Sequence, residues 1–159
     1  MNKVGVILVN WNGGQLTKDC IDSLINGSEV PDYIVVVDND SKDDSINLLT
    51  KSFGERIIFI KNDENKGFAE ANNQGIALLD KKGAEYIWLL NNDTVVDREC
   101  LKELLTTQKS SNDEKLAAVS SKIYYETERE KIWYAGAKRN KYSFAVKHST
   151  DDINEDIKT

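Results

Sequence analysis

The chain alternates between short apolar runs rich in β-branched residues and longer segments with helical periodicity. The apolar runs cover residues 4–9, 33–38, 57–60 and 86–90. Runs of this length and composition predict strands that are buried on both faces, as in a parallel sheet. Strands joined by helices predict right-handed βαβ units. The expected fold is therefore α/β, with a mainly parallel sheet flanked by helices.

The remaining segments set the expected boundaries of the helices and of two further strands. We expect helices over residues 16–25, within 39–53, within 62–83 with an end at Gly83, and from a cap at Asp97 to about Leu105. A fifth strand is expected over residues 116–120, and "KIWYAGAKRNK" has room for one more. From Tyr124 onward the pattern decays, and nothing in the polar tail "HSTDDINEDIKT" is expected to complete a core.

Composition and charge restrict the class of protein. The chain has 159 residues, of which 40% are apolar and 30% are charged with both signs mixed, which suits one domain with a core. A net charge of −6 without a large cluster of lysine and arginine argues against a nucleic-acid partner. No signal peptide or membrane-length apolar run is visible, so we expect a soluble, cytoplasmic protein. Cys20 and Cys100 fall in apolar helical patterns and are expected to be buried free thiols.

Polar residues follow each of four predicted strands at its carboxyl end. The four groups are Asn10, Trp11 and Asn12; Asp38, Asn39, Asp40 and Ser41; Asn62, Asp63, Asn65, Lys66 and Gly67; and Asn91, Asn92 and Asp93. In open parallel sheets, ligands bind beyond the carboxyl ends of the strands. Each group alone is typical of an ordinary turn. Together, at the ends of strongly apolar strands, the four groups predict a shared ligand site at one edge of the sheet.

The chemistry of these residues favours a phosphate-bearing ligand held through a metal ion. A dinucleotide is the first candidate for a βαβ fold, but "NWNGGQ" lacks the Gly-x-Gly-x-x-Gly spacing and no Walker-type loop occurs. Positive charge for a diphosphate then has to come from Mg²⁺ or Mn²⁺, which proteins commonly hold through one or two carboxylates and substrate phosphates. Asp93 is the candidate metal ligand. Asp38 is placed to accept hydrogen bonds from a base or a ribose, because a carboxylate offers only acceptors.

Four ordered motifs of the chain resemble those of the family 2 glycosyltransferases, which have the GT-A fold. They are "VILVNWNG", "IVVVDNDSKDDS", "NKGFAEANNQGI" and "WLLNNDTVV". The resemblance runs from about Lys3 to Leu105, with a weaker echo at "IWYAGAK". It implies an inverting transfer of a sugar from a nucleotide-diphosphate-sugar donor to a glycan, lipid-linked or other hydroxyl acceptor, in cell-wall or polysaccharide biosynthesis. The resemblance is also compatible with peripheral membrane association of the full-length protein.

The resemblance assigns residues 1–121 to a Rossmann-like domain that binds the donor, and residues 122–159 to the incomplete start of an acceptor-side region. The implied donor-binding residues are Asn10, Trp11, Asn12, Asp38, Asp40, Lys66, Gly67, Asn72, Asn91, Asn92 and Asp93. Asn10 and Asn12 would lie beside the nucleotide, Asp38 would contact the base, and Asp40 would support that loop. Gly67 would let the backbone approach the donor, with Asn72 holding the loop or the ribose.

The "NND" sequence stands where the family carries its Asp-x-Asp motif. By the resemblance, its last residue, Asp93, binds the metal, while Asn91 replaces the first aspartate and adds no charge. This form is most similar to the rhamnosyltransferase-like branch, which implies a dTDP-rhamnose-like donor. The family takes its catalytic base from a later Glu-Asp motif. Glu155-Asp156 lacks the aromatic lead-in of that motif and is interpreted as a solvated tail, so we expect a truncated chain without the base.

Several interpretations remain open at the level of sequence. The chain could act as a non-catalytic module that binds nucleotide sugars, or as a sugar nucleotidyltransferase, although "NWNGGQ" lacks the basic residues of that class. Trp11 either stacks on a base or packs against a neighbouring helix. Lys66 either touches a phosphate or is an ordinary exposed loop lysine. Trp133 and Tyr134 either line an acceptor cleft or form an exposed apolar patch.

Overall fold

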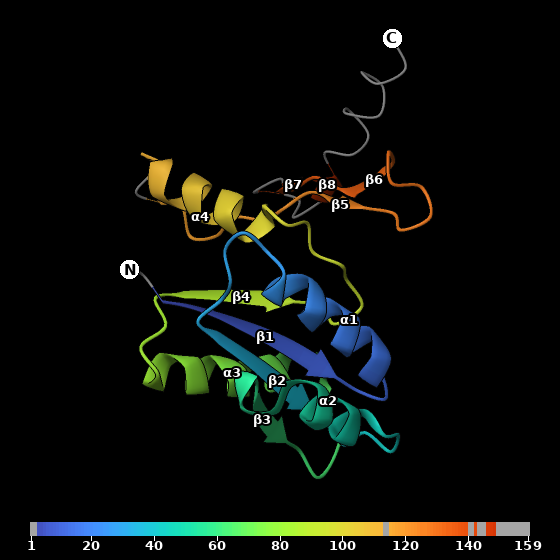
Figure 1. Cartoon of the computed structure of the whole chain (residues 1–159). Coiled ribbons are helices and arrows are strands. Elements are labelled where there is room, and N and C mark those ends of the chain that lie inside the picture. The colour runs from blue at the N-terminus through green and yellow to red at the C-terminus, as the bar shows by residue number, and fades with distance from the viewer. Residues whose placement is uncertain (1–2, 113–114, 140–141, 143–145, 149–159) are drawn as a thin grey trace. The chain divides into compact units, whose positions relative to one another are not determined.

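A computed structural model of the chain describes residues 3–112, 115–139, 142 and 146–148. The chain divides into two compact units, Met1–Lys102 and Glu103–Thr159. The first unit holds the predicted alternation of strands and helices (Figure 1). Its elements are β1 (Val4–Asn10), α1 (Gly14–Ile25), β2 (Tyr33–Asp38), α2 (Ser45–Phe53), a 3₁₀ turn (Gly54–Arg56), β3 (Ile58–Lys61), α3 (Gly67–Lys81) and β4 (Tyr86–Leu90).

The four strands of this unit form one parallel sheet in the order β3-β2-β1-β4. The order places the first strand in the middle, with crossovers on both sides, as in other doubly wound folds. The predicted α/β class and the parallel sheet are confirmed. Because every strand of the sheet runs in the same direction, all four carboxyl ends lie at one edge.

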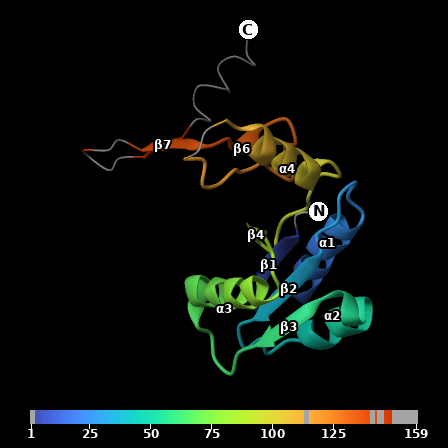
Figure 2. The same ribbon diagram turned by 90° about the vertical axis from the view of Figure 1, so that its left-hand side faces the viewer.

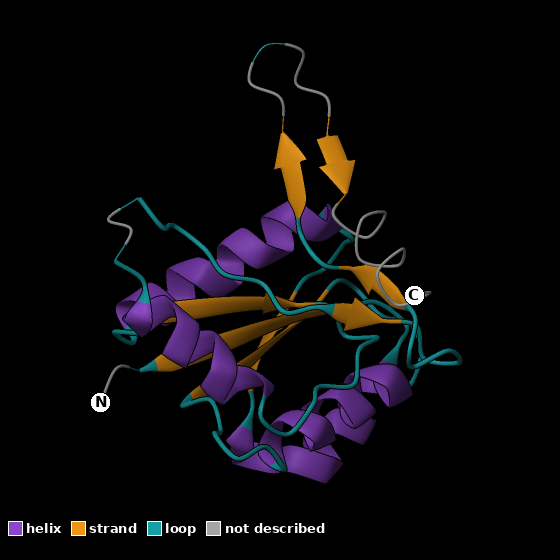
Figure 3. Cartoon of the chain, turned by 90° about the horizontal axis from the view of Figure 1, so that it is seen from above, coloured by secondary structure: helices purple, strands orange, loops and turns teal. Residues whose placement is uncertain are grey.

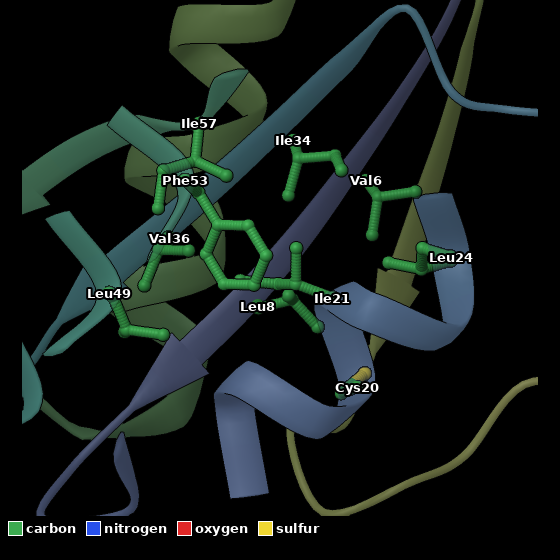
Figure 4. Close-up of a cluster of buried hydrophobic side chains, with 10 residues drawn as sticks. All are labelled: Val6, Leu8, Cys20, Ile21, Leu24, Ile34, Val36, Leu49, Phe53 and Ile57. Carbon is green, nitrogen blue, oxygen red and sulfur yellow. The ribbon is translucent and has the colours of Figure 1, made fainter. Parts of the chain in front are cut away.

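Helices cover the two faces of this sheet differently. Successive residues of a strand point to opposite faces, so Val6 and Leu8 of β1 pack with α1 and α2, while Ile7 packs with α3. Figure 2 shows α3 on one side of the sheet and α2 on the other. Figure 4 shows the larger of the two cores, in which Phe53 and Ile21 meet the side chains of β1 and β2.

Helix α1 packs against the sheet through one face. Its buried residues include Thr17, Cys20, Ile21 and Leu24, which follow the i, i+3, i+4, i+7 spacing of one helix face. Leu16 lies off this face and is exposed. The helix begins two residues earlier than expected, at Gly14. Its first turn therefore starts directly after the polar residues that end β1, and Thr17 is carried inward beneath them.

The second unit contains two short antiparallel pairs of strands. Helix α4 (Cys100–Ser110) crosses the division between the units, and the strands are β5 (Ile123–Tyr124), β6 (Ile132–Tyr134), β7 (Ala137–Arg139) and β8 (Val146–His148). β5 pairs with β6 and β7 pairs with β8. Figure 3 colours these strands and the helices by type. No described helix is both long enough and apolar enough to cross a membrane.

The structure corrects the expectations for the later part of the chain. The fifth strand predicted over residues 116–120 is wrong, because that segment is irregular and pairs with no described strand. Its composition suited a strand, but a strand is stable only with a hydrogen-bonded neighbour. "KIWYAGAKRNK" holds two strands, β6 and β7, instead of one. They are separated at Gly136, whose φ of 101° breaks the extended conformation.

Two boundaries also move. β3 begins at Ile58, one residue later than predicted, and α4 runs from Cys100 to Ser110 instead of starting at Asp97. Asp97 makes a turn ahead of this helix: its carboxylate accepts the Glu99 N–H at 2.9 Å and its carbonyl accepts the Cys100 N–H at 3.0 Å. The assignment of residues 1–121 to donor binding and 122–159 to an acceptor-side region stays a prediction.

Candidate functional site

The four polar groups lie together at the carboxyl edge of the parallel sheet. Asn10 at the end of β1 stands opposite Asp38 at the end of β2, and Asp38 stands opposite Lys61 at the end of β3. On the other side of β1, Leu8 stands opposite Leu90, the last residue of β4. The loops after β1, β2 and β3 therefore start at a common level, whereas β4 ends two residues before that level. Side-chain hydrogen bonds then join the loops to one another.

Asp38 is the centre of the first set of bonds. Its Oδ1 accepts the Ser41 N–H at 2.9 Å, and its Oδ2 accepts the Asn10 Nδ2 group and the Ser41 hydroxyl, both at 2.7 Å. Only 1% of Asp38 and none of Asn10 is exposed. A buried carboxylate is tolerated only when donors of this kind surround it. Asp38 and Asn10 thus hold the ends of β1 and β2 together beneath the surface of the edge.

Two residues of these loops adopt left-handed backbone conformations without being glycine. Asn12 has φ 53° and Asp40 has φ 64°. Asn12 is held by its backbone N–H, which donates to the Ser41 hydroxyl, and by its side-chain oxygen, which accepts the Lys42 N–H at 2.7 Å. Asp40 forms an ion pair with Lys42. Strained conformations that neighbours hold in place are concentrated at binding sites, and here both occur on adjoining loops of the predicted site.

Trp11 projects from the same edge with 58% of its surface exposed. More than half of the residue is thus accessible to a ligand, and the choice between stacking on a base and packing against a helix stays a prediction. A large apolar ring between two polar loops offers a flat face on which a planar base can stack. Phe68, in the first turn of α3, is exposed to the same extent, 58%.

A second set of bonds holds the loop between β3 and α3. Asn62 and Gln74 form a reciprocal amide pair at 3.0 and 2.9 Å, and Asn62 also donates to Asn39 at 2.8 Å. Asn39 in turn donates to Asn65 and to the carbonyl of Gly67, both at 3.2 Å. The loop that carries Gly67 is thereby tied to the end of β2.

The remaining predicted residues of this loop differ in accessibility. Gly67 is exposed and has φ 78°, a conformation that glycine adopts without strain. Lys66 is exposed, and no hydrogen bond or ion pair of its side chain occurs within the described residues. Asn72 is 4% exposed and donates to the carbonyl of Phe68 at 2.8 Å. Its side chain thus bonds to the first turn of α3, and its role toward the loop or a ribose stays a prediction.

The three residues after β4 point in different directions. Asn91 is exposed, and its carbonyl accepts the Thr94 hydroxyl at 2.8 Å. Asn92 is half-buried and donates to the Thr17 hydroxyl at 2.8 Å. Asp93 is exposed, and its carboxylate makes no hydrogen bond or ion pair with any residue that the structure describes. The loop is therefore held to α1 through the Asn92 side chain, the Asn91 carbonyl and Thr94, and it carries one free carboxylate.

The donors at this edge suit a metal ion that binds together with a phosphate ligand. No three histidine, cysteine or acidic side chains of the described residues gather into a group that could hold a metal by itself. Mg²⁺ and Mn²⁺ do not require such a cage, because one carboxylate and the oxygens of a diphosphate complete their coordination. Asp93 is exposed and unpaired, so it is available as that carboxylate.

The sequence of the chain matches the family model "Glycosyl transferase family 2" over residues 5–157. The chain belongs to this family. Among curated relatives, it is 25% identical to a chondroitin synthase of Pasteurella multocida over 170 residues, which cover 97% of this chain and 17% of that protein. It is 26% identical to an O-antigen chain rhamnosyltransferase of Salmonella typhimurium, over 65% of this chain and 32% of that protein. The chain thus spans a third or less of the length of these relatives.

Solved structures agree on the fold of this family 2 chain. Staphylococcus aureus TarS 1-349 in complex with UDP-GlcNAc superposes with a TM-score of 0.60 at 18% identity, over 78% of this chain and 38% of that one. The mannosyltransferase PcManGT from Pyrobaculum calidifontis in complex with GDP-Man and Mn²⁺ gives a TM-score of 0.58 at 19% identity, over 77% and 36%. The GT-A fold inferred from the motifs is confirmed.

Some residues of the site were not predicted. Thr17 and Gln74 have no place in the four polar groups, because both lie within helices and only the folded chain brings them to the edge. Each falls on the inner face of its helix, and a polar residue on such a face was the available signal. Glu155 and Asp156, considered above as a base, lie outside the described residues.

Cys20 of this family 2 chain lies directly under the loop after β4. Its thiol is buried, as predicted, at 3.7 Å from the Asn91 carbonyl and 3.8 Å from the Thr94 hydroxyl. Burial raises the pKa of the Cys20 thiol to about 11, the bonds to Thr94 oppose this rise, and the negative charge of Asp93 adds to it. Cys100 is only half-buried, so the prediction of burial is wrong for that cysteine.

The raised pKa predicts a loss of stability in alkali. Below a pH of about 9.0 the thiol is protonated in both states. Between that pH and about 11 the unfolded thiol ionises while the folded one keeps its proton, so the free energy of unfolding falls, by about 2 kcal/mol. Urea unfolding at a series of pH values would measure the fall. The Cys20→Ala variant should lack this component, and an identical decline in both proteins would contradict the assignment.

Proposed function

We propose that this chain is the donor-binding part of an inverting glycosyltransferase, in which a nucleotide-diphosphate sugar and Mg²⁺ or Mn²⁺ bind at the carboxyl edge of the sheet. The observation that carries the proposal is the exposed, unpaired carboxylate of Asp93 beside two loops that buried hydrogen bonds hold rigid. The fold neighbours bound to UDP-GlcNAc, and to GDP-Man with Mn²⁺, support it.

The proposed roles follow from where each side chain is exposed. Trp11 offers its ring to the base, and Asn12 and Asp40 shape the adjoining loops. Asp38 and Asn10 are buried and act from below by fixing the loops that would meet the base. Asn91, Lys66 and the backbone at Gly67 are accessible to the rest of the donor.

The chemistry of transfer requires charge neutralisation and orientation. Asp93 would hold a divalent ion, which would supply positive charge beside the diphosphate as the nucleotide leaves. The contribution of the chain itself is to hold the donor in one orientation against the acceptor hydroxyl. A base must take the proton of that hydroxyl, and we assign this role to none of the described residues.

The donor is proposed to be a dTDP-rhamnose-like deoxysugar nucleotide, and the acceptor a glycan. Two observations support this choice: the "NND" form of the loop after β4, and the similarity to an O-antigen chain rhamnosyltransferase. Thymidine diphosphate should accordingly bind more tightly than guanosine diphosphate in the presence of Mn²⁺. Equal binding of the two would remove the support for this donor while leaving the class of reaction intact.

The proposal predicts that thymidine diphosphate and Mn²⁺ together raise the melting temperature more than the sum of their separate effects, because each completes the binding site of the other. A ligand at a hundredfold excess over its Kd stabilises the folded state by about 2.7 kcal/mol. A thermal shift series with each ligand alone and with both would measure this. Asp93→Ala should abolish the dependence on metal.

Asp80→Ala is the matched control for that experiment. It removes one exposed carboxylate from the last turn of α3, close to the opposite edge of the sheet. It should therefore keep the full combined shift. If Asp93→Ala kept it too, the assignment of the metal to Asp93 would be wrong.

A further inference from the structure

Thr17 lies at a junction between two parts of the candidate site. The residue belongs to the first turn of α1 and is fully buried. Its hydroxyl donates to Asn10 Oδ1 at 2.7 Å and accepts a hydrogen bond from Asn92 Nδ2 at 2.8 Å. Asn10 ends β1, whereas Asn92 belongs to the loop after β4, which carries Asp93. One hydroxyl thus bridges two loops that are far apart in the sequence.

The bridge continues beyond Asn10 to the predicted base-binding side. Asn10 uses its Oδ1 for Thr17 and its Nδ2 for Asp38, so the amide is fixed in one orientation. The four side chains form an unbroken line of hydrogen bonds, Asp38–Asn10–Thr17–Asn92. A buried line of directional bonds transmits a displacement better than apolar packing does, because each member has only one satisfied orientation.

Gly13, between Asn10 and Thr17 in the sequence, packs closely against the Asn92 and Asn10 side chains of this junction. A Cβ atom placed on Gly13 would lie 3.1 Å from Asn92 Nδ2 and 3.6 Å from Asn10 Oδ1. A side chain at position 13 would therefore press on the Asn92 amide, which would have to move to make room for it. The bond to Thr17 is also the one side-chain hydrogen bond of Asn92 within the described part of the chain. The orientation of Asn92, the neighbour of Asp93, therefore depends on the Thr17 hydroxyl.

We propose that Thr17 is a positioning residue that couples nucleotide binding at the ends of β1 and β2 to metal binding at Asp93. The inference rests on the proposed function. A nucleotide that tightens the Asn10 and Asp38 loops favours one position of Asn92, and hence of the Asp93 loop. Coupling of this kind is reciprocal: the metal raises the affinity for the nucleotide by the same factor by which the nucleotide raises the affinity for the metal.

The test measures this coupling factor by calorimetry. The Kd of thymidine diphosphate is determined with and without Mn²⁺ in wild type, Thr17→Val and Thr17→Ser. Valine keeps the shape of threonine but removes the hydroxyl, whereas serine keeps the hydroxyl. The coupling factor is the Kd without Mn²⁺ divided by the Kd with Mn²⁺. We expect Thr17→Val to lower this factor about fivefold, which corresponds to the free energy of one ordinary hydrogen bond. Thr17→Ser should retain the wild-type factor. Direct contact of metal and diphosphate would supply the coupling that remains.

A merely structural role for Thr17 would give a different result. Loss of stability alone would weaken binding equally with and without Mn²⁺, so the ratio of Kd values would not change. A ratio for Thr17→Val within twofold of the wild-type ratio would overturn the inference and leave the proposed function standing. If wild type bound thymidine diphosphate with no dependence on Mn²⁺, the proposed function would fail, and the inference with it.

A second variant keeps the inference testable if Thr17→Val does not fold. Asn92→Ala breaks the same hydrogen bond from the exposed side of the junction and leaves the bond between Thr17 and Asn10 in place. It should lower the coupling factor to the same extent. In a folded Thr17→Val/Asn92→Ala double variant the two losses should not add, because both changes break the same hydrogen bond between Asn92 and Thr17. Additive losses, or an unchanged factor in Asn92→Ala, would overturn the inference.

Discussion

Replacing Asp38 by alanine is expected to lower the free energy of unfolding by about 3 kcal/mol and to abolish nucleotide binding. The substitution leaves the N–H and hydroxyl groups of Ser41 without their acceptor at a site that is 1% exposed. It also removes one of the two acceptors of the Asn10 amide, which keeps its 3.0 Å bond to the Ser41 hydroxyl oxygen. A buried donor without a partner costs about 1–3 kcal/mol. Relief of the cost of burying the carboxylate offsets part of the loss.

Urea unfolding and calorimetry with thymidine diphosphate and Mn²⁺ would measure the two effects of Asp38→Ala. Asp32→Ala is the matched control, since Asp32 precedes the strand that Asp38 ends. Among the described residues, its exposed carboxylate accepts only the Val4 N–H, at 2.8 Å. This control should lose about 1 kcal/mol and bind nucleotide normally. Wild-type binding by Asp38→Ala would show that the ends of β1 and β2 do not form the nucleotide side of the site.

Replacing Leu24 by alanine is expected to destabilise the first unit by about 2–5 kcal/mol, the range for deleting a buried leucine side chain. Leu24 is 2% exposed and packs in the core between α1 and the sheet (Figure 4). The cost combines the lost burial of apolar surface with the cavity that the neighbouring side chains cannot fill.

Leu16→Ala on the same helix is the control for this experiment. Leu16 is 54% exposed, so the same chemical change should alter the free energy of unfolding by less than about 0.5 kcal/mol. Chemical unfolding followed by tryptophan fluorescence would compare the two variants. Similar losses in both would mean that α1 does not pack on the sheet through the face described here.

Much of the fold could be predicted because its signals are local. The runs that end at Asn10, Asp38 and Leu90 are continuously apolar, and polar turn residues follow each of them, so the number and direction of the strands can be inferred from neighbouring residues alone. The prediction failed at residues 116–120, where an apolar run pairs with none of the strands that the structure describes. The pairing of strands depends on segments that are far apart in the sequence, so local composition cannot predict it.

The sequence by itself determined the parallel βα alternation, the family, and the gathering of four polar groups at one edge, since strand direction alone brings those ends together. Only the tertiary structure decided which of these residues are buried and support the loops, and which are exposed to a ligand. Asn10 and Asp38 are buried, whereas Trp11 and Asp93 are open. The structure also brought Thr17 and Asn92 within one hydrogen bond of each other. Burial and hydrogen-bond partners depend on residues far apart in the chain, which become neighbours only when the sheet and its helices pack.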